Sequence, residues 1–251
     1  MLEVIDLSPT ISKEEYSQRL RNLQRRTWQL QRACWVSGIP TMIVFEGWDA
    51  AGKGTVIRRL TSRLEPRGYN LHHVTDDPRT HERDLPWLWR FWGMLPAYGS
   101  MAIFDRSWNR VAVEQRVNGC NELRWRRAMR DIGDFERTLS DDGYVPIKFF
   151  LHISRKEQLE RYDSWKEDPG TSWKALEGGW NKPRRYQKRL HATEELLQHT
   201  EFSHAPWHIV SATDRRWATI TVLEQIIESL LEVVEHRAPD IDPFLDDEGS
   251  S

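Results

Sequence analysis

Cysteine, long apolar runs and net charge are all scarce in this sequence. Its 251 residues include only two cysteines, Cys34 and Cys120, without metal-ligand spacing, so neither a disulfide framework nor a zinc site is predicted. No apolar run approaches the roughly 18 residues that cross a bilayer, and the N-terminus lacks a secretory pattern. We therefore expect a cytoplasmic protein without membrane contact. The net charge of −2 argues against coating of nucleic acid, so any polyanion site must be local.

Apolar, β-branched segments alternate with segments of helical spacing along the chain. Ser12, followed by Glu15 three residues later, forms a capping box that opens the first helix. No internal repeat or low-complexity linker interrupts the alternation. The pattern predicts an α/β fold, a doubly wound parallel sheet with helices on both faces, as one domain over residues 1–239. The acidic tail at 240–251 is expected to be disordered. Strands are predicted at 40–45, 69–75, 101–104, 145–153 and 207–210, and helices at 12–34, 53–64, 85–95, 123–139, from 155, up to 197 and at 216–236.

The segment GWDAAGKGT at residues 47–55 follows the first predicted strand and precedes a helix. That setting is the one a P-loop requires, because its backbone N–H groups and the helix N-terminus surround a phosphate. Lys53 supplies a mobile cation to the transferring group. The residues predicted to bind phosphate or nucleotide through this loop are Gly47, Ala50, Ala51, Gly52, Lys53, Gly54 and Thr55.

The loop departs from the usual motif at one position. Ser or Thr normally follows the lysine and holds Mg²⁺, whereas here Gly54 follows it and Thr55 comes one place later. Asp49, inside the loop, is a plausible substitute ligand, because a carboxylate among phosphates makes sense mainly with a divalent cation between them. The alternative is that Asp49 caps the following helix.

A second carboxylate, Asp105, stands at the end of the predicted strand at 101–104, where a Walker-B residue binds Mg²⁺. Arg106 and Arg110 follow it closely. A planar guanidinium matches phosphate oxygens bidentately, so both arginines suit charge neutralisation during phosphoryl transfer. The alternative is a surface salt-bridge cluster. The sequence therefore predicts a magnesium site that Asp49 and Asp105 share, with Lys53, Arg106 and Arg110 in catalytic roles.

Further basic and polar segments surround these motifs. Arg58 and Arg59, on the helix after the loop, could line the path of a long polyanion, and a solvated helix face explains them equally well. The polar stretch at about 161–185 has the composition of a mobile lid. The nine histidines lack metal spacing, and we interpret them as structural or solvent-facing.

Taken together, these motifs resemble one family, the polyphosphate kinase 2 family. The resemblance extends over about residues 12–236. It rests on FEGWDAAGKG at 45–54, LWRFW at 88–92, FDRSW at 104–108, Asp168-Pro169 before SWK at 172–174, APW at 205–207 and ATDRR at 212–216.

The resemblance implies a thymidylate-kinase-like P-loop fold with a helical lid, Mg²⁺ dependence and an oligomer, either a dimer or a tetramer. It further implies transfer of phosphoryl groups between inorganic polyphosphate and AMP or ADP. On the matching positions, Asp49 and Asp105 would hold Mg²⁺, and Lys53 and Arg106 would contact the transferring phosphates. The resemblance also implies that Arg110 and Arg161 would close on these phosphates, and that Arg58 and Arg59 would line the polyphosphate path.

One departure from the family affects the second motif. The family usually has a Tyr after Asp-Arg-Ser-Trp, whereas here Trp108 is followed at once by Asn109 and Arg110. This shift would rotate Arg110 and Glu114 relative to Asp105.

The favoured function is formation of ADP from AMP and polyphosphate. The alternatives are an ATP-dependent small-molecule kinase and a catalytically weak subunit that binds polyphosphate or nucleotide.

Overall fold

The structure, a computed structural model, describes residues 2–75, 84–167, 169–170, 172 and 183–244. Its centre is a five-stranded sheet in the order β2-β3-β1-β4-β5, in which every neighbouring pair is parallel. The order reverses direction beside β1, and ligands of such sheets bind at the carboxyl ends of the strands near this point. The strands are β1 (Thr41–Gly47), β2 (Tyr69–His73), β3 (Met101–Asp105), β4 (Val145–His152) and β5 (Trp207–Ser211).

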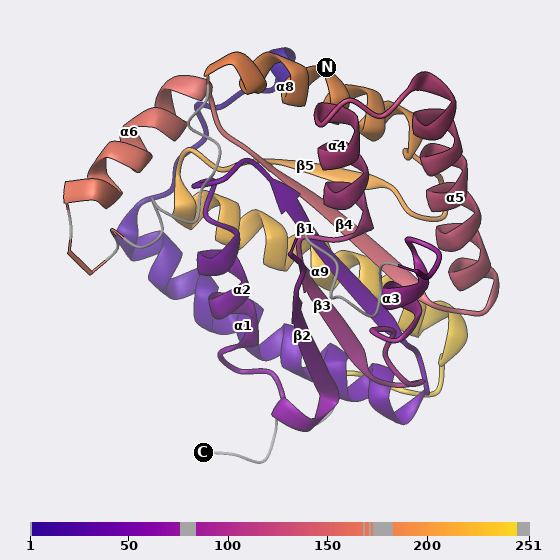
Figure 1. Ribbon diagram of the computed structural model, residues 1–251. Helices are drawn as coiled ribbons and strands as arrows, with labels where there is room; N and C mark the ends of the chain where they lie inside the picture. The colour runs from indigo at the N-terminus through magenta and orange to yellow at the C-terminus, as the bar shows by residue number, and fades with distance from the viewer. Residues whose placement is uncertain (1, 76–83, 168, 171, 173–182, 245–251) are drawn as a thin grey trace.

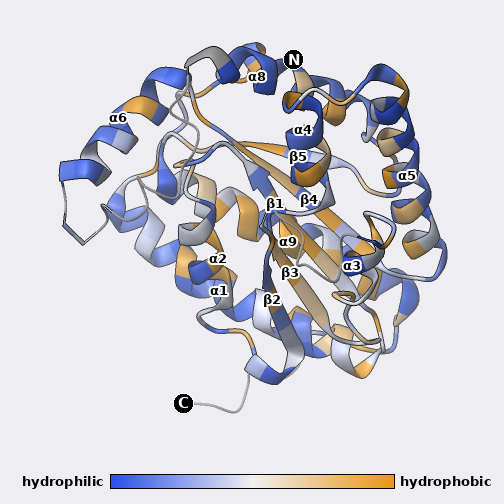
Figure 2. Ribbon diagram, viewed as in Figure 1, coloured by the Kyte–Doolittle hydropathy of each residue, from blue (hydrophilic) through white to orange (hydrophobic). Residues whose placement is uncertain are grey.

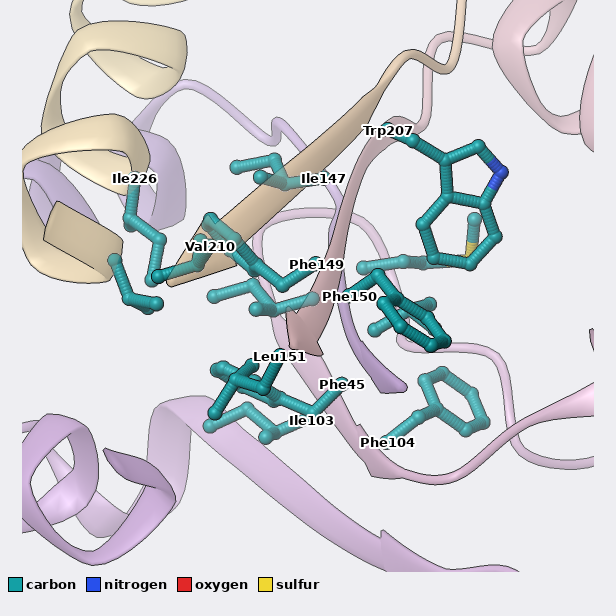
Figure 3. Close-up of a cluster of buried hydrophobic side chains, with 14 of the residues drawn as sticks. Phe45, Ile103, Phe104, Ile147, Phe149, Phe150, Leu151, Trp207, Val210 and Ile226 are labelled. Atoms are coloured by element: carbon teal, nitrogen blue, oxygen red, sulfur yellow. The ribbon is translucent and has the colours of Figure 1, made fainter. Parts of the chain in front are cut away.

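Strands β1 and β4 are buried along their whole length, as the continuous apolar runs predict for a sheet that is covered on both faces. Phe45 of β1 stacks on Phe149 of β4 with ring centroids 5.5 Å apart. These rings belong to the cluster in Figure 3, in which side chains from four neighbouring strands pack together. The hydrophobic core thus holds β1 rigidly, and β1 carries the phosphate loop at its end.

Helices cover both faces of the sheet (Figure 1). Helices α1, α2 and α9 pack against one another, with α9 against β4 and β5; α4 packs against α5 and α8, with α5 against β4. Hydrophobic residues concentrate on the sheet, whereas the outer sides of the helices are mostly polar (Figure 2). The helices are α1 (Lys13–Val36), α2 (Lys53–Thr61), α3 (Trp89–Trp92), α4 (Trp108–Val117), α5 (Glu122–Asp141), α6 (Arg155–Glu167), α8 (Pro183–His199) and α9 (Arg215–Arg237), with short 3₁₀ turns at Leu2–Val4 and Pro66–Gly68.

Most expected elements are present, and α1 begins as predicted, with Ser12 Oγ accepting from the backbone N–H of Glu15 at 3.1 Å. The buried helix predicted at 85–95 is wrong. Only one turn, α3, forms there, and Trp89 and Trp92 are exposed. Pro86 and Pro96 bracket this segment and limit a longer helix.

Other expectations concern segments that the structure describes only in part. The predicted lid at about 161–185 begins within α6 and ends within α8, and most of what joins them lies outside the described residues, as does the end of the acidic tail. Within the described part of the chain, no helix combines the length and apolarity that a bilayer crossing demands.

Candidate active site

The phosphate loop joins the end of β1 to α2 and bends sharply at three positions. Gly47 has φ +132°, Ala50 φ +65° and Gly52 φ +106°. A Cβ on Gly47 would lie 2.3 Å from the carbonyl oxygen of Leu151 on β4, so only glycine fits there. Alternation of right- and left-handed residues turns successive N–H groups toward one side and makes an anion-binding nest. The loop therefore has the geometry of an anion-binding nest, and phosphate binding there stays a prediction.

Lys53, the first residue of α2, lies inside this loop and is almost fully buried. Its Nζ donates to the carbonyl oxygens of Gly47 at 3.0 Å and Trp48 at 3.1 Å. Burial lowers the pKa of the Lys53 ammonium, and the carboxylates of Asp49 and Asp105 partly oppose this shift. Both predicted metal ligands therefore lie close enough to Lys53 to influence its charge.

Arg106, the residue after Asp105, contacts Asp49. The Arg106 Nη2 donates to Asp49 Oδ1 at 3.0 Å, and the Arg106 backbone N–H donates to the carbonyl oxygen of Phe45 at 2.9 Å. Arg106 itself has φ +69°, which is uncommon for a residue with a Cβ. The backbone thus turns directly after Asp105 and directs the arginine to the phosphate loop.

A histidine that the sequence analysis assigned to structure or solvent contacts the second carboxylate. His73, at the end of β2, lies with Nδ1 3.2 Å from Asp105 Oδ2, because the parallel register pairs these two residues. Burial alone would raise the pKa of the Asp105 carboxyl. The hydrogen bond to His73 and the charge of Lys53 outweigh burial, so this pKa lies below its ordinary value. Asp105 is consequently ionised and able to bind a cation at neutral pH.

A cavity of about 680 Å³ opens over the loop. It brings together most of the predicted site residues from the loop after β1, from α2 and from the end of β3. Its lining also includes residues that the sequence analysis did not select, namely His73, Thr75, Tyr162 and Trp165. The predicted residues that line it are Asp49, Ala50, Gly52, Lys53, Gly54, Thr55, Arg58, Asp105 and Arg106.

Five predicted residues are not part of this lining. Two of them, Gly47 and Ala51, belong to the loop itself, and Gly47 lines a small neighbouring cavity. Arg59 is exposed on α2 outside the lining of this cavity. Arg110 is buried on α4, where its Nε lies 3.4 Å from Glu114 Oε1, and it lines a small cavity beside Gly47 and Trp48. Arg161 is buried and outside this lining, and its guanidinium donates to backbone carbonyl oxygens of Ala50 and Ala212.

Glu46, the residue before the loop, connects β1 to the second motif. Its Oε1 accepts from the backbone N–H of Ser107 at 2.9 Å, from Ser107 Oγ at 2.8 Å and from the backbone N–H of Arg110 at 3.1 Å. Burial raises the pKa of the Glu46 carboxyl. A carboxylate at the N-terminus of α4 is favoured by the helix dipole. Glu46 thereby fixes the position of α4 relative to the loop.

The fold and the site together define a P-loop protein of the kinase-like α/β class, with a phosphate nest, a lysine and two carboxylates at one cavity. Comparison with known proteins makes the class specific. The model of the family "Polyphosphate kinase 2 (PPK2)" matches residues 10–238. The chain belongs to the polyphosphate kinase 2 family, whose phosphotransferases generally need a divalent metal ion.

Individual relatives agree with this assignment. The chain is 39% identical over 231 residues to the polyphosphate:AMP phosphotransferase of Pseudomonas syringae, which covers 92% of this chain and 46% of that protein. It is 33% identical to the ADP-polyphosphate phosphotransferase of Pseudomonas aeruginosa, over 90% of this chain and 74% of that one. The crystal structure of polyphosphate kinase 2 from Arthrobacter aurescens superposes with a TM-score of 0.88 at 26% identity, over 93% of this chain and 86% of that one. The chain thus spans about half the length of the polyphosphate:AMP phosphotransferase that it matches.

Proposed function

We propose that this protein is a Mg²⁺-dependent phosphotransferase that moves a phosphoryl group from inorganic polyphosphate to AMP, giving ADP, and from polyphosphate to ADP, giving ATP. The observation that carries the proposal is the cavity where the phosphate nest, Lys53, Asp49 and Asp105 meet. The relatives named as polyphosphate:AMP phosphotransferases, at 36–39% identity, support AMP as the acceptor. The relative named as an ADP-polyphosphate phosphotransferase is less similar, at 33% identity.

The donor set fits a hard divalent cation. Asp49 and Asp105 offer carboxylate oxygens at one cavity, and among the described residues no group of three His, Cys, Asp or Glu could hold a metal. Mg²⁺ commonly takes one or two carboxylates, with phosphate oxygens and water completing its coordination. When bound, the ion would neutralise charge on the phosphoryl group in transfer. Asp49 and Asp105 are the residues that would hold it.

The other side chains divide into binding and charge-neutralising roles. The loop N–H groups hold the phosphates in position, which accounts for much of the catalysis in phosphoryl transfer. Lys53 and Arg106 stabilise charge on the transferring group, and Arg58, which lines the cavity, continues a basic path for the polyphosphate chain. His73 keeps Asp105 oriented through its hydrogen bond.

A second cavity, of about 690 Å³, lies between α4, α5 and the segment at 85–90, and we assign it to the acceptor nucleoside. Trp87 and Arg90 offer planar groups on which a base could stack. The Arg90 Nη2 also donates to the carbonyl oxygen of Thr75 at 3.2 Å, and Thr75 lines the cavity over the loop. The two cavities are therefore neighbours, as a donor and an acceptor site must be.

The test is an assay with polyphosphate as the sole donor, AMP or ADP as the acceptor and Mg²⁺ present, with products separated by chromatography. We expect ADP from AMP, and loss of turnover on addition of a chelator. Turnover with ATP but not with polyphosphate would instead support a small-molecule kinase. Binding of tripolyphosphate without turnover would support a catalytically weak subunit. Light scattering of the purified protein tests the proposed homo-oligomer.

Substitution of the second carboxylate sharpens this test. Asp105→Asn removes a metal-binding charge while preserving side-chain size, so we expect turnover to fall by about a thousandfold or more, on the scale of lost transition-state charge stabilisation. The circular dichroism spectrum should stay unchanged. Asp141→Asn, at the exposed end of α5, is the matched control and should retain full activity. A wild-type rate for Asp105→Asn would refute the metal assignment.

A further inference from the structure

Three consecutive carbonyl oxygens of the phosphate loop accept hydrogen bonds from one helix, α6. Gln158 Nε2 donates to the carbonyl oxygen of Asp49 at 3.0 Å. Arg161 Nη1 donates to those of Ala50 at 2.8 Å and Ala51 at 3.2 Å. Gln158 and Arg161 are not in the lining of the cavity over the loop, whereas Tyr162 and Trp165 of the same helix are. Together these bonds fix the direction of three loop carbonyl groups.

The donor side chains occupy one face of α6, since positions 158, 161 and 162 follow the i, i+3, i+4 spacing of a helix. All three are buried, with exposed fractions of 6% for Gln158, 7% for Arg161 and 2% for Tyr162. The Tyr162 hydroxyl donates to Asp49 Oδ2 at 3.4 Å, while Arg106 occupies the other carboxylate oxygen. We name these three residues the α6 cluster.

Arg161 also bonds a second loop. Its Nη2 donates to the carbonyl oxygens of Ala212 at 2.9 Å and Thr213 at 2.7 Å, and its Nε donates to Glu157 at 2.6 Å. A guanidinium has five N–H donors, and these contacts with the two from Nη1 use all five. The arginine therefore joins the loop after β1 to the loop after β5 and has no donor left for a ligand in this conformation.

The phosphate loop needs such support because its conformation is strained. Ala50 has φ +65°, and a non-glycine residue in the left-handed region is disfavoured unless its surroundings hold it. The bonds to Ala50 and Ala51 come from a charged, buried donor, which is the stronger kind. The Arg215 side chain, which follows the second loop, lies 3.7 Å from the position of a Cβ on Gly52. Moving one loop would therefore disturb the other.

We propose that the α6 cluster fixes the phosphate loop in its phosphate-binding conformation, and that Arg161 is a positioning residue that acts through the backbone of the loops after β1 and β5. This assignment differs from the role that family resemblance implies for Arg161, which is direct contact with the transferring phosphates. The expected effect on phosphate binding rests on the proposed function. The expected effect on hydrogen exchange of the ligand-free loops does not depend on it.

Hydrogen exchange of the ligand-free protein tests the proposal independently of activity. In Arg161→Met we expect exchange of the peptides covering 46–56 and 210–217 to rise by about tenfold or more, because several hydrogen bonds to a buried charge are lost. Exchange in the core of β4 should not change. Lys156→Met, on the exposed side of α6 with 86% of its side chain accessible, is the matched control and should exchange like the wild type.

Arg161→Lys separates positioning from charge. A lysine keeps the charge but cannot bond four carbonyl oxygens of two loops at once. We therefore expect Arg161→Lys to exchange like Arg161→Met and to lose affinity for inorganic tripolyphosphate by about tenfold in calorimetric titration. Wild-type affinity in Arg161→Lys, or unchanged loop exchange in Arg161→Met, would overturn the proposal. If Arg161→Met fails to fold, Gln158→Met takes its place, and unchanged exchange at 46–56 in that variant has the same meaning.

Discussion

Replacing Gly47 by alanine is the most direct test of how the phosphate loop is built. Gly47 pairs with Leu151 in the register of β1 and β4, and Trp48 donates its backbone N–H to the carbonyl oxygen of Leu151 at 3.2 Å. A Cβ at position 47 would lie 2.3 Å from that oxygen and 2.7 Å from the Leu151 nitrogen. Both atoms belong to the backbone of a fully buried strand, so no side-chain rotation can relieve the clash.

Two costs add in Gly47→Ala. A non-glycine residue at φ +132° costs about 1–3 kcal/mol in backbone strain. Forcing a methyl group against a packed strand costs about 1–3 kcal/mol more. We therefore expect the free energy of unfolding to fall by about 2–6 kcal/mol, and the melting temperature to fall by roughly 5–20 °C for a chain of this length.

Gly54→Ala is the matched control from the same loop. A Cβ on Gly54 would meet nothing within 4 Å, and alanine is the better helix former by about 0.5–1 kcal/mol. Thermal and urea unfolding of both variants, followed by circular dichroism, should show a loss of stability only for Gly47→Ala. Tripolyphosphate binding is compared with the wild type for Gly47→Ala alone, where we expect it to be lost, because Gly54 itself lines the cavity. A melting temperature for Gly47→Ala within about 2 °C of the wild type, less than about 1 kcal/mol at this chain length, would refute the steric argument.

Two further predictions concern buried groups away from the cavity. Lys148 is fully buried and its Nζ donates to Glu136 Oε2 at 2.7 Å. Lys148→Met should lower the free energy of unfolding by about 3–5 kcal/mol, since the buried Glu136 loses its cationic partner and keeps the Trp108 indole N–H at 2.9 Å. The double variant with Glu136→Gln should recover most of that loss in urea unfolding, and equal stability of the single and double variants would contradict this reasoning. Burial raises the pKa of the Cys34 thiol from 9.0 to about 11. Between these two pH values the folded state keeps the thiol proton that the unfolded chain releases. The contribution of Cys34 to the free energy of unfolding is therefore complete below pH 9, and roughly 2–3 kcal/mol of it is lost as the pH rises to 11. Cys34→Ala should show a correspondingly smaller loss of stability over that range than the wild type, and identical pH profiles would exclude the effect.

The residues of the phosphate loop illustrate what could be predicted. GWDAAGKGT between a strand and a helix indicates a phosphate nest, because the glycines, the lysine and the helix N-terminus act locally. Asp105 could be placed at the same edge, because parallel strands end together. Both predictions depend on short motifs at the ends of predicted strands, which can be recognised in the sequence.

Other features depend on contacts between distant segments. No helix was predicted at 108–117, where α4 forms. The first turn of α4 is held by Glu46, which belongs to β1 and lies far away in the sequence. His73 reaches Asp105 only through the register of β2 and β3. The one available signal was that His73 lies near the end of one predicted strand and that Asp105 directly follows another.

Arg161 shows the limit most clearly. Sequence and family resemblance identified it as a cation near the site, but α6 has no marked apolar face and its polar spacing indicates no direction. By itself the sequence determined the α/β order, the phosphate loop and the two carboxylates, since these follow from local periodicity and backbone chemistry. Only the tertiary structure decided that α6 packs behind the loop, because the direction of an arginine depends on which carbonyl groups the folded chain brings within its reach.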